Sequence, residues 1–172
     1  MTNEEILAEL RTSVFQWREK AEQVYGRAFV TPVVSLELKG ACAGLATRKE
    51  WKLFFNPALF LRDKAYFFNQ CVPHELAHLL NFAINYTPGW PLASHGEEWK
   101  EVMRKLGVEP KRLHHLDTTG LVNRRSKPYT YQCGCRKHQL TETLHRRIQF
   151  GYKGRVRTYT CNKCGEAIKE VA

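Results

Sequence analysis

The sequence contains no apolar run that approaches the roughly 20 residues a transmembrane helix needs. Its opening residues, Met1-Thr2-Asn3-Glu4-Glu5, are polar and acidic, so they lack the basic start and apolar stretch of a secretory signal. Internal repeats and low-complexity tracts are also absent. We therefore expect a soluble cytoplasmic protein that has no membrane partner.

The composition excludes a disordered chain, because 43% of the residues are hydrophobic and 12% are aromatic. A length of 172 residues suits one compact domain with a small appendage. The six cysteines stand in a chain that is too long for a disulfide-stabilised miniprotein and has no export signal. Metal binding or free thiols are therefore favoured over disulfides.

Acidic residues are scarce in the C-terminal part of the chain. Residues 1–99 hold 10 lysines and arginines against 11 acidic residues, a net charge of −1, whereas residues 100–172 hold 17 against 6, a net charge of +11. An excess of this size in one region favours a polyanionic partner, with nucleic acid first. The alternative is a basic, solvated surface that binds nothing.

The N-terminal part predicts a helix followed by strands. Apolar residues at three- and four-residue spacing indicate an amphipathic helix over residues 2–25, with Thr2 and Glu5 as a capping box and Gly26 as its end. A strand is expected at residues 33–38.

A β-hairpin is expected next, with strands at residues 45–47 and 51–55. A long helix should then run from Asp63 to about Asn85, either kinked at Pro73 or beginning afresh just before His74.

The segment Ser94-His95-Gly96-Glu97 reads as a second capping box, which would open a helix that ends near residue 106. Residues 108–128 contain prolines, glycine and many charges, and predict a long surface connection. From Tyr129 onward, short aromatic and β-branched runs surround four cysteines. We expect an α+β protein with a first domain at residues 1–128 and a small cysteine-rich module at residues 129–172.

His74 and His78 are four residues apart, so on a helix both imidazoles lie on one face and can bind one ion. Glu75 follows the first histidine, and from there its carboxylate can reach a metal-bound water. Two nitrogen ligands and a base that is not itself a ligand are what a zinc hydrolase requires. The motif predicts a catalytic zinc ion with Glu75 as the general base.

A catalytic zinc needs a third protein ligand and one open position. His95 is the candidate, because the loop of residues 86–94 can turn the chain back toward the helix, and Ser94 as cap would make His95 the first residue of the next helix. Glu97 and Glu98 are weaker alternatives for the third ligand. The second donor to a developing oxyanion is not identified; the sequence offers His114, His115 and Tyr86.

Four cysteines predict a second, structural zinc site. Cys161 and Cys164 have the two-residue gap of a zinc knuckle, and Cys133 and Cys135 form the other half. The 25 residues between the halves leave room for a small hairpin. His138 is a rival for one of the four places, and two disulfides or free thiols are the alternative to zinc. We assign no function to the remaining two cysteines, Cys42 and Cys71.

Cationic and aromatic side chains interleave in the C-terminal module. Cations can contact phosphates and aromatic rings can stack on unpaired bases, so we expect nucleic-acid binding without strong sequence preference. The rings of Phe150, Tyr152 and Tyr159 are also expected to form the small core of the module. The cationic candidates are Arg136, Lys137, Arg146, Arg147, Lys153, Arg155 and Arg157.

Four stretches together resemble the SprT family, whose eukaryotic branch includes the Spartan proteases. They are residues 72–79 (VPHELAHL), 94–99 (SHGEEW), 131–141 (YQCGCRKHQLT) and 159–165 (YTCNKCG), in that order. The resemblance implies a zincin-like zinc metalloprotease domain with its small hairpin sheet, followed by a zinc ribbon. It also implies that His74, His78 and His95 hold the zinc and that Glu75 is catalytic.

Spartan-type relatives cleave proteins crosslinked to DNA and are activated by DNA, so the resemblance implies protein substrates, DNA as a partner and a role in DNA repair. The predicted function is a zinc-dependent endopeptidase acting on DNA-associated proteins, with residues 51–55 holding the substrate as an added strand. The alternatives are a non-catalytic DNA-binding zinc protein, a general cytoplasmic metallopeptidase, and a metal-dependent hydrolase of substrates other than peptides.

Overall fold

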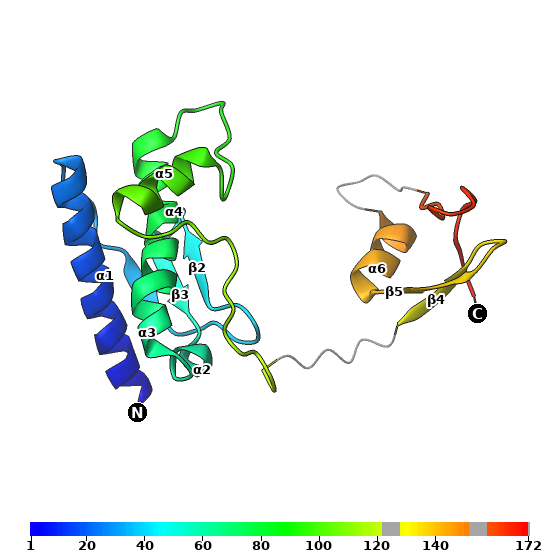
Figure 1. Ribbon diagram of the computed structural model, residues 1–172, viewed down its shortest axis with the longest axis horizontal. Coiled ribbons are helices and arrows are strands. Elements are labelled where there is room, and N and C mark those ends of the chain that lie inside the picture. Colours follow the sequence, from blue (N-terminus) through cyan, green and yellow to red (C-terminus); the bar gives the residue numbers. More distant parts are fainter. Residues whose placement is uncertain (122–127, 152–157, 172) are drawn as a thin grey trace. The chain divides into compact units, whose positions relative to one another are not determined.

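The computed structural model describes residues 1–121, 128–151 and 158–171 (Figure 1). The chain divides into two compact units, Met1–Asn123 and Arg124–Ala172, whereas the sequence placed the division at residues 128 and 129. Both units mix helices with small sheets, so the α+β class is confirmed. In the described part of the chain, no helix combines the length and apolarity needed to cross a membrane.

The first unit contains a three-stranded sheet and several helices. Its elements are α1 (Asn3–Tyr25), β1 (Val33–Ser35), β2 (Gly44–Thr47), β3 (Lys52–Phe55), α2 (Pro57–Phe60), α3 (Lys64–Tyr66), the π-helical turn η1 (Phe67–Cys71), α4 (Val72–Asn85) and α5 (Glu97–Lys105). Figure 1 shows α1 running alongside α4.

Helix α1 follows its sequence pattern closely. Thr2 and Glu5 form the capping box, and Gly26 ends the helix in the left-handed conformation with φ 62°. Ile6, Leu10 and other apolar residues of one face are buried in the core. The helix packs on α4 and so supports the element that carries the histidine motif.

The sheet has the strand order β1-β3-β2, with β1 parallel and β2 antiparallel to β3. The predicted hairpin is confirmed, whereas the first strand ends at Ser35, three residues earlier than expected. Because β3 is the central strand, the prediction that residues 51–55 accept a substrate strand is wrong: both edges of β3 are already paired. The edge strand beside α4 is β2.

The long helix predicted from Asp63 is broken by a π-helical turn. The Asp63 carboxylate accepts a hydrogen bond from the Tyr66 N–H and begins α3, and η1 then leads into α4 at Val72. The Val72 N–H donates to the Phe67 carbonyl, five residues back. Of the two alternatives from the sequence, a helix start just before His74 is the nearer description. Wide turns of this kind are frequent at functional sites.

Helix α5 begins two residues later than predicted. Its N-cap is Gly96, which has no side chain to offer, so the predicted Ser94 cap is wrong and His95 lies in the turn before the helix. The Glu97 carboxylate is drawn instead to Arg104, at 2.7 Å, and to Lys100, at 3.3 Å.

The described residues of the second unit form a small three-stranded sheet and one helix. Its elements are β4 (Tyr129–Gln132), β5 (Lys137–Leu140), α6 (Glu142–Phe150) and β6 (Lys169–Glu170), in the sheet order β5-β4-β6. Between the cysteine pairs, where the sequence leaves room for a hairpin, the described residues form strand β5, which pairs with β4, and then α6, which Thr141 caps through its hydroxyl.

The core of this unit differs from the prediction. Tyr131 is buried, with 1% of its surface exposed, but Phe150 at the end of α6 is 80% exposed and therefore is not a core residue. Tyr159 is half-buried, and Tyr152 lies outside the described residues.

Candidate metal centre

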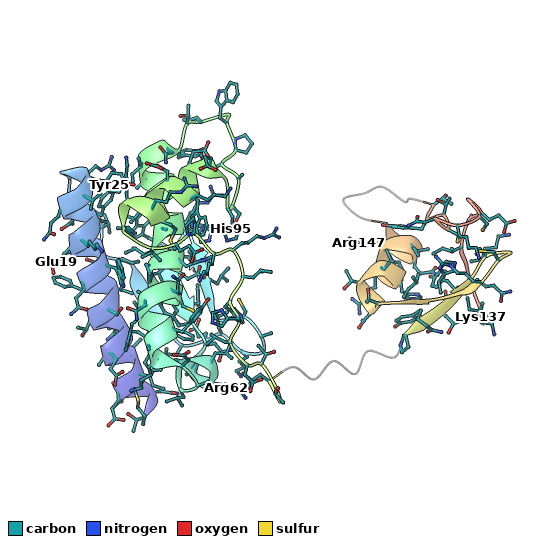
Figure 2. All side chains as sticks on the ribbon, in the orientation of Figure 1. Glu19, Tyr25, Arg62, His95, Lys137 and Arg147 are labelled. Atoms are coloured by element: carbon teal, nitrogen blue, oxygen red, sulfur yellow. The ribbon has the colours of Figure 1, made fainter. Side chains whose placement is uncertain are left out.

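Three histidine side chains converge in the first unit. His74 and His78 lie one turn apart on α4. His95, which is labelled in Figure 2, reaches them from the turn before α5. One ring nitrogen of each lies within 4.8 Å of the others. The sequence predicted this triad, and the structure brings all three residues together.

The geometry of the triad fits a zinc ion. The Nε2 atoms of His95 and His74 are 3.2 Å apart. Two nitrogens bound tetrahedrally to one zinc at about 2.0–2.1 Å would be separated by about 3.3 Å. Burial lowers the pKa of His74 to about 4 and that of His78 to about 3, so both imidazoles are neutral at pH 7 and can act as ligands.

Backbone carbonyls orient two of these rings. The Nδ1 atom of His74 lies 3.1 Å from the Lys111 carbonyl oxygen, and His78 bonds to the Ser94 backbone. A histidine that ligates a metal usually donates its other ring N–H to such a group, which fixes the tautomer and the ring plane. Neither contact could be predicted from sequence spacing, because Lys111 lies 37 residues beyond His74.

The Trp99 ring packs against all three histidines of the triad, a role that was not predicted from the sequence. Its fully buried ring lies 4.8 Å from His74, 5.4 Å from His78 and 4.7 Å from His95, measured between ring centroids. Trp99 is the third residue of α5, so its packing also sets how α5 approaches α4. The signal in the sequence was a large aromatic residue four positions after the third histidine.

Glu75 lies on α4 between the histidines and is only 8% exposed. Burial raises the pKa of Glu75 to about 8, although the Ala46 backbone, through a hydrogen bond to the carboxylate, partly opposes the shift. The Glu75 Oε1 atom is 4.0 Å from the His74 Nε2 atom, so it lies beside the metal site without joining the triad.

Gly44 on β2 makes room for this carboxylate. A Cβ atom at position 44 would lie 2.6 Å from the Glu75 Cγ and 2.7 Å from Oε1, which is far inside van der Waals contact. Strand β2 therefore positions Glu75 in two ways. The Ala46 backbone forms a hydrogen bond with the carboxylate, and the Gly44 backbone lies against the side chain and restricts its movement.

The triad and Glu75 line a cleft of about 510 Å³. Strand β2 and the loop before it form one wall, and residues 111–114 form another. His114 lines the cleft, with its Nε2 atom 2.8 Å from the Ala41 carbonyl oxygen. His115 and Tyr86, the other predicted oxyanion donors, are not among the lining residues, and neither are Glu97 and Glu98.

The second unit gathers its four cysteines into one cluster. The Sγ atoms of Cys133, Cys135, Cys161 and Cys164 all lie within 4.8 Å of one another. The separations of 3.5 Å between Cys133 and Cys135 and 3.7 Å between Cys135 and Cys161 match the roughly 3.8 Å expected for thiolates on a tetrahedral zinc. All four are free thiols here, so two disulfides do not form.

His138 remains close to this cluster. Its Nε2 atom lies 3.3 Å from the Cys133 Sγ, within hydrogen-bonding distance of a thiolate. The cysteine loops are also joined through Glu166, whose carboxylate accepts a hydrogen bond from the Gly134 N–H at 2.6 Å. The four sulfurs form a group that could hold a metal ion, and His138, which contacts Cys133, stays the rival for one of the four places.

The predicted nucleic-acid contacts are spread over the second unit. Arg136 and Lys137 are exposed near the first cysteine pair, and Arg146 is exposed on α6, where it pairs with Glu142 at 2.8 Å. Figure 2 labels Lys137 on β5 and Arg147 on α6, on different elements of the unit. Lys153, Arg155 and Arg157 lie outside the described residues.

Comparison with known proteins identifies one family. A family model described as the SprT-like family matches residues 14–119. Protein SprT of Serratia proteamaculans is 35% identical over 157 residues, covering 88% of this chain and 85% of that protein. Protein SprT of Actinobacillus succinogenes is 37% identical over 154 residues, covering 89% and 84%. No solved structure matches the chain.

Proposed function

The chain belongs to the SprT-like family, and from this premise we propose that it is a zinc-dependent endopeptidase with a zincin-like catalytic domain. The observation that carries the proposal is the convergence of three neutral imidazoles beside a buried carboxylate in an open cleft. Three protein ligands leave the open coordination position that distinguishes a catalytic zinc from a structural one.

The histidines at positions 74, 78 and 95 would hold the ion, and the Lys111 carbonyl and Trp99 would fix the planes of their rings. When bound, zinc lowers the pKa of a water molecule and polarises the carbonyl of the scissile bond. The remaining chemistry is proton transfer, which falls to Glu75.

In the proposed mechanism, Glu75 accepts a proton from the attacking water and later delivers it to the leaving amine. A buried carboxyl group with a pKa of about 8 suits both roles, because a group whose pKa lies near the working pH can both accept and donate a proton. The Ala46 hydrogen bond and the closeness of Gly44 hold the Glu75 carboxylate beside the triad, 4.0 Å from the His74 Nε2 atom, where it would face a water bound to the metal.

The substrate backbone has a natural place along β2. The Ala43 carbonyl accepts a hydrogen bond from Asn56 beyond the end of β3, and the Gly44 carbonyl accepts one from Cys42 instead. Backbone direction alternates along a strand, so the polar groups of Gly44 and Ala46 face away from β3. We propose that an extended peptide pairs with this edge and passes Glu75.

A DNA-linked role is proposed for the second unit. Its support is the net charge of +9 carried by residues 124–172, which hold 12 lysines and arginines against 3 acidic residues, and the exposed cations around the cysteine cluster. The four thiolates would hold a structural zinc, since they leave no open position. The proposed substrates are proteins associated with or crosslinked to DNA, bound without strong sequence preference, which would give the protein a role in DNA repair.

The test is cleavage of a DNA-binding protein by the zinc-loaded chain, with and without single-stranded DNA, beside Glu75→Gln. The variant keeps the size of the side chain and the three histidines, so it should retain zinc and lose cleavage. Cleavage that ignores DNA would favour a general metallopeptidase. Full activity in the variant would refute the role of Glu75, and a wild type that cuts no protein would favour a non-catalytic DNA-binding zinc protein.

A further inference from the structure

The cleft carries an excess of positive charge. Apart from histidines, the charged groups among its described lining residues are Arg48, Lys111 and Arg112 against the single carboxylate of Glu75. Lys111 is neutralised by Glu109, 2.9 Å away. Arg48 and Arg112 form no ion pair with any described residue, so their charges are not neutralised within the cleft.

Arg112 lies beside the third histidine. Both residues line the cleft, and the carbonyl of the preceding residue, Lys111, lies 3.1 Å from the Nδ1 atom of His74. Contacts on both sides of Arg112 hold its backbone. The Lys111 carbonyl is within hydrogen-bonding distance of the His74 ring, and the His114 ring is within hydrogen-bonding distance of the Ala41 carbonyl. Leu116 is buried in the core. The backbone that carries Arg112 is therefore held in place, and the exposed Arg112 side chain is among the residues that line the cleft beside the triad.

Arg62 completes the anchoring of this wall. It donates hydrogen bonds to the backbone carbonyls of Asp117, at 2.6 Å, and Thr119, at 2.7 Å. Its guanidinium also forms an ion pair with the Asp117 carboxylate, at 3.2 Å. Figure 2 labels Arg62 beside α2, where the chain that follows α5 returns along the first unit.

Arg48 stands on another wall, in the turn that follows the edge strand β2. Its guanidinium lies over the ring of Phe82, 5.0 Å from the centroid. Phe82 is four residues beyond His78, so it lies one helical turn further along α4. The two arginines thus flank the triad, one beside His95 and one beyond His78.

We propose that this cleft is an acid-selective substrate site, in which Arg112 and Arg48 bind carboxylate side chains of a polypeptide near the scissile bond. The inference rests on the proposed peptidase function and adds the substrate class. The site favours a polypeptide over nucleic acid because the outer edge of β2 and the apolar lining residues Leu45, Leu92 and Leu113 suit an extended peptide. Nucleic acid would instead need a row of phosphate contacts and open aromatic faces, and Arg48 covers Phe82.

The experiment measures peptide binding by fluorescence anisotropy on the full-length, zinc-loaded protein. Three labelled ten-residue peptides share one neutral sequence and carry two central glutamates, glutamines or lysines. Arg112→Gln and Arg48→Gln each remove one cleft charge. Arg11→Gln is the matched control, because Arg11 is exposed on α1 and does not line the cleft. Circular dichroism and zinc content verify that every variant is folded and loaded.

We expect the glutamate peptide to bind most tightly and the lysine peptide most weakly. Each cleft variant should weaken the glutamate peptide about three- to fivefold, as for a partly exposed ion pair, and leave the glutamine peptide unchanged. Arg11→Gln should change neither. Since the readout is binding, this result would support the acid-selective site even if the protein cleaved no peptide, which would refute the peptidase function alone.

Equal affinity for the three peptides in the wild type would overturn the proposal. A second outcome would also overturn it. The wild type and the three variants would bind the glutamate peptide equally well, and an added oligonucleotide would weaken that binding by the same factor in all four proteins. That outcome would assign the acidic-peptide binding to the basic second unit.

Discussion

Gly44→Ala is expected to separate zinc binding from catalysis. The new Cβ would lie 2.6 Å from the Glu75 Cγ, and ordinary contact between carbon atoms needs about 3.5–4.0 Å. Strand β2 is held by its pairing with β3, so the side chain of Glu75 must move by about 1 Å. The movement would also disturb the hydrogen bond between Ala46 and the carboxylate.

A misplacement of about 1 Å in a catalytic group can cost about 100-fold in rate. We therefore expect kcat to fall by about two orders of magnitude, while KM and the zinc content stay close to those of the wild type. The assay is steady-state cleavage of a peptide together with metal analysis of the purified variant.

The matched control is Gly26→Ala at the end of α1, where a Cβ meets nothing within 4 Å. That change strains a left-handed residue, with φ 62°, and should lower stability by about 1 kcal/mol without altering kcat. If Gly44→Ala cleaves within twofold of the wild type, the confinement of Glu75 by the edge strand is refuted.

Three further predictions concern the metal sites. Trp99→Ala should destabilise the first unit by about 3–5 kcal/mol in urea unfolding and weaken zinc binding, because a fully buried ring that packs against the three histidines is lost. Unchanged zinc affinity would contradict the supporting role of Trp99. In the metal-free protein, burial holds the pKa values of His74 and His78 at about 4 and 3, below the ordinary 6.5, so the unfolded chain binds more protons than the folded chain below pH 6.5. Stability should therefore fall as the pH is lowered from 6.5 toward 4, and His78→Ala should flatten the fall measured by thermal unfolding; an unchanged slope would count against the burial of a neutral ring. Cys161→Ser should release one equivalent of zinc and unfold the second unit, as seen in its amide NMR signals, while those of the first unit stay in place; an intact second unit would refute a structural metal there.

Local patterns predicted what depends on neighbours in sequence. The cap and end of α1 were predictable because Thr2, Glu5 and Gly26 act through contacts within one turn. The convergence of His74 and His78 likewise follows from helical periodicity. His95 could be proposed because a loop rich in proline and glycine precedes it, although the accompanying prediction of a helix cap at Ser94 was wrong.

Features set by distant packing could not be predicted in this way. The order of the sheet depends on the parallel pairing of β1 with β3, which the sequence did not predict. Because of this pairing β3 is the central strand, and β2 is the edge strand beside α4. The carbonyl of Lys111 meets His74 only because the chain returns after α5. Helix α6 was missed because its nine residues are mostly charged or polar and none is fully buried, so Leu144 and Ile148 are the only apolar pair at helical spacing.

The most direct test of the proposed centre is a crystal structure of the zinc-loaded protein, with anomalous diffraction recorded at the zinc edge. We expect zinc within about 2.0–2.1 Å of one nitrogen each of His74, His78 and His95, with a non-protein oxygen in the fourth position next to Glu75. A fourth protein ligand at this ion, or an ion that leaves His95 unbound, would contradict the catalytic site proposed here.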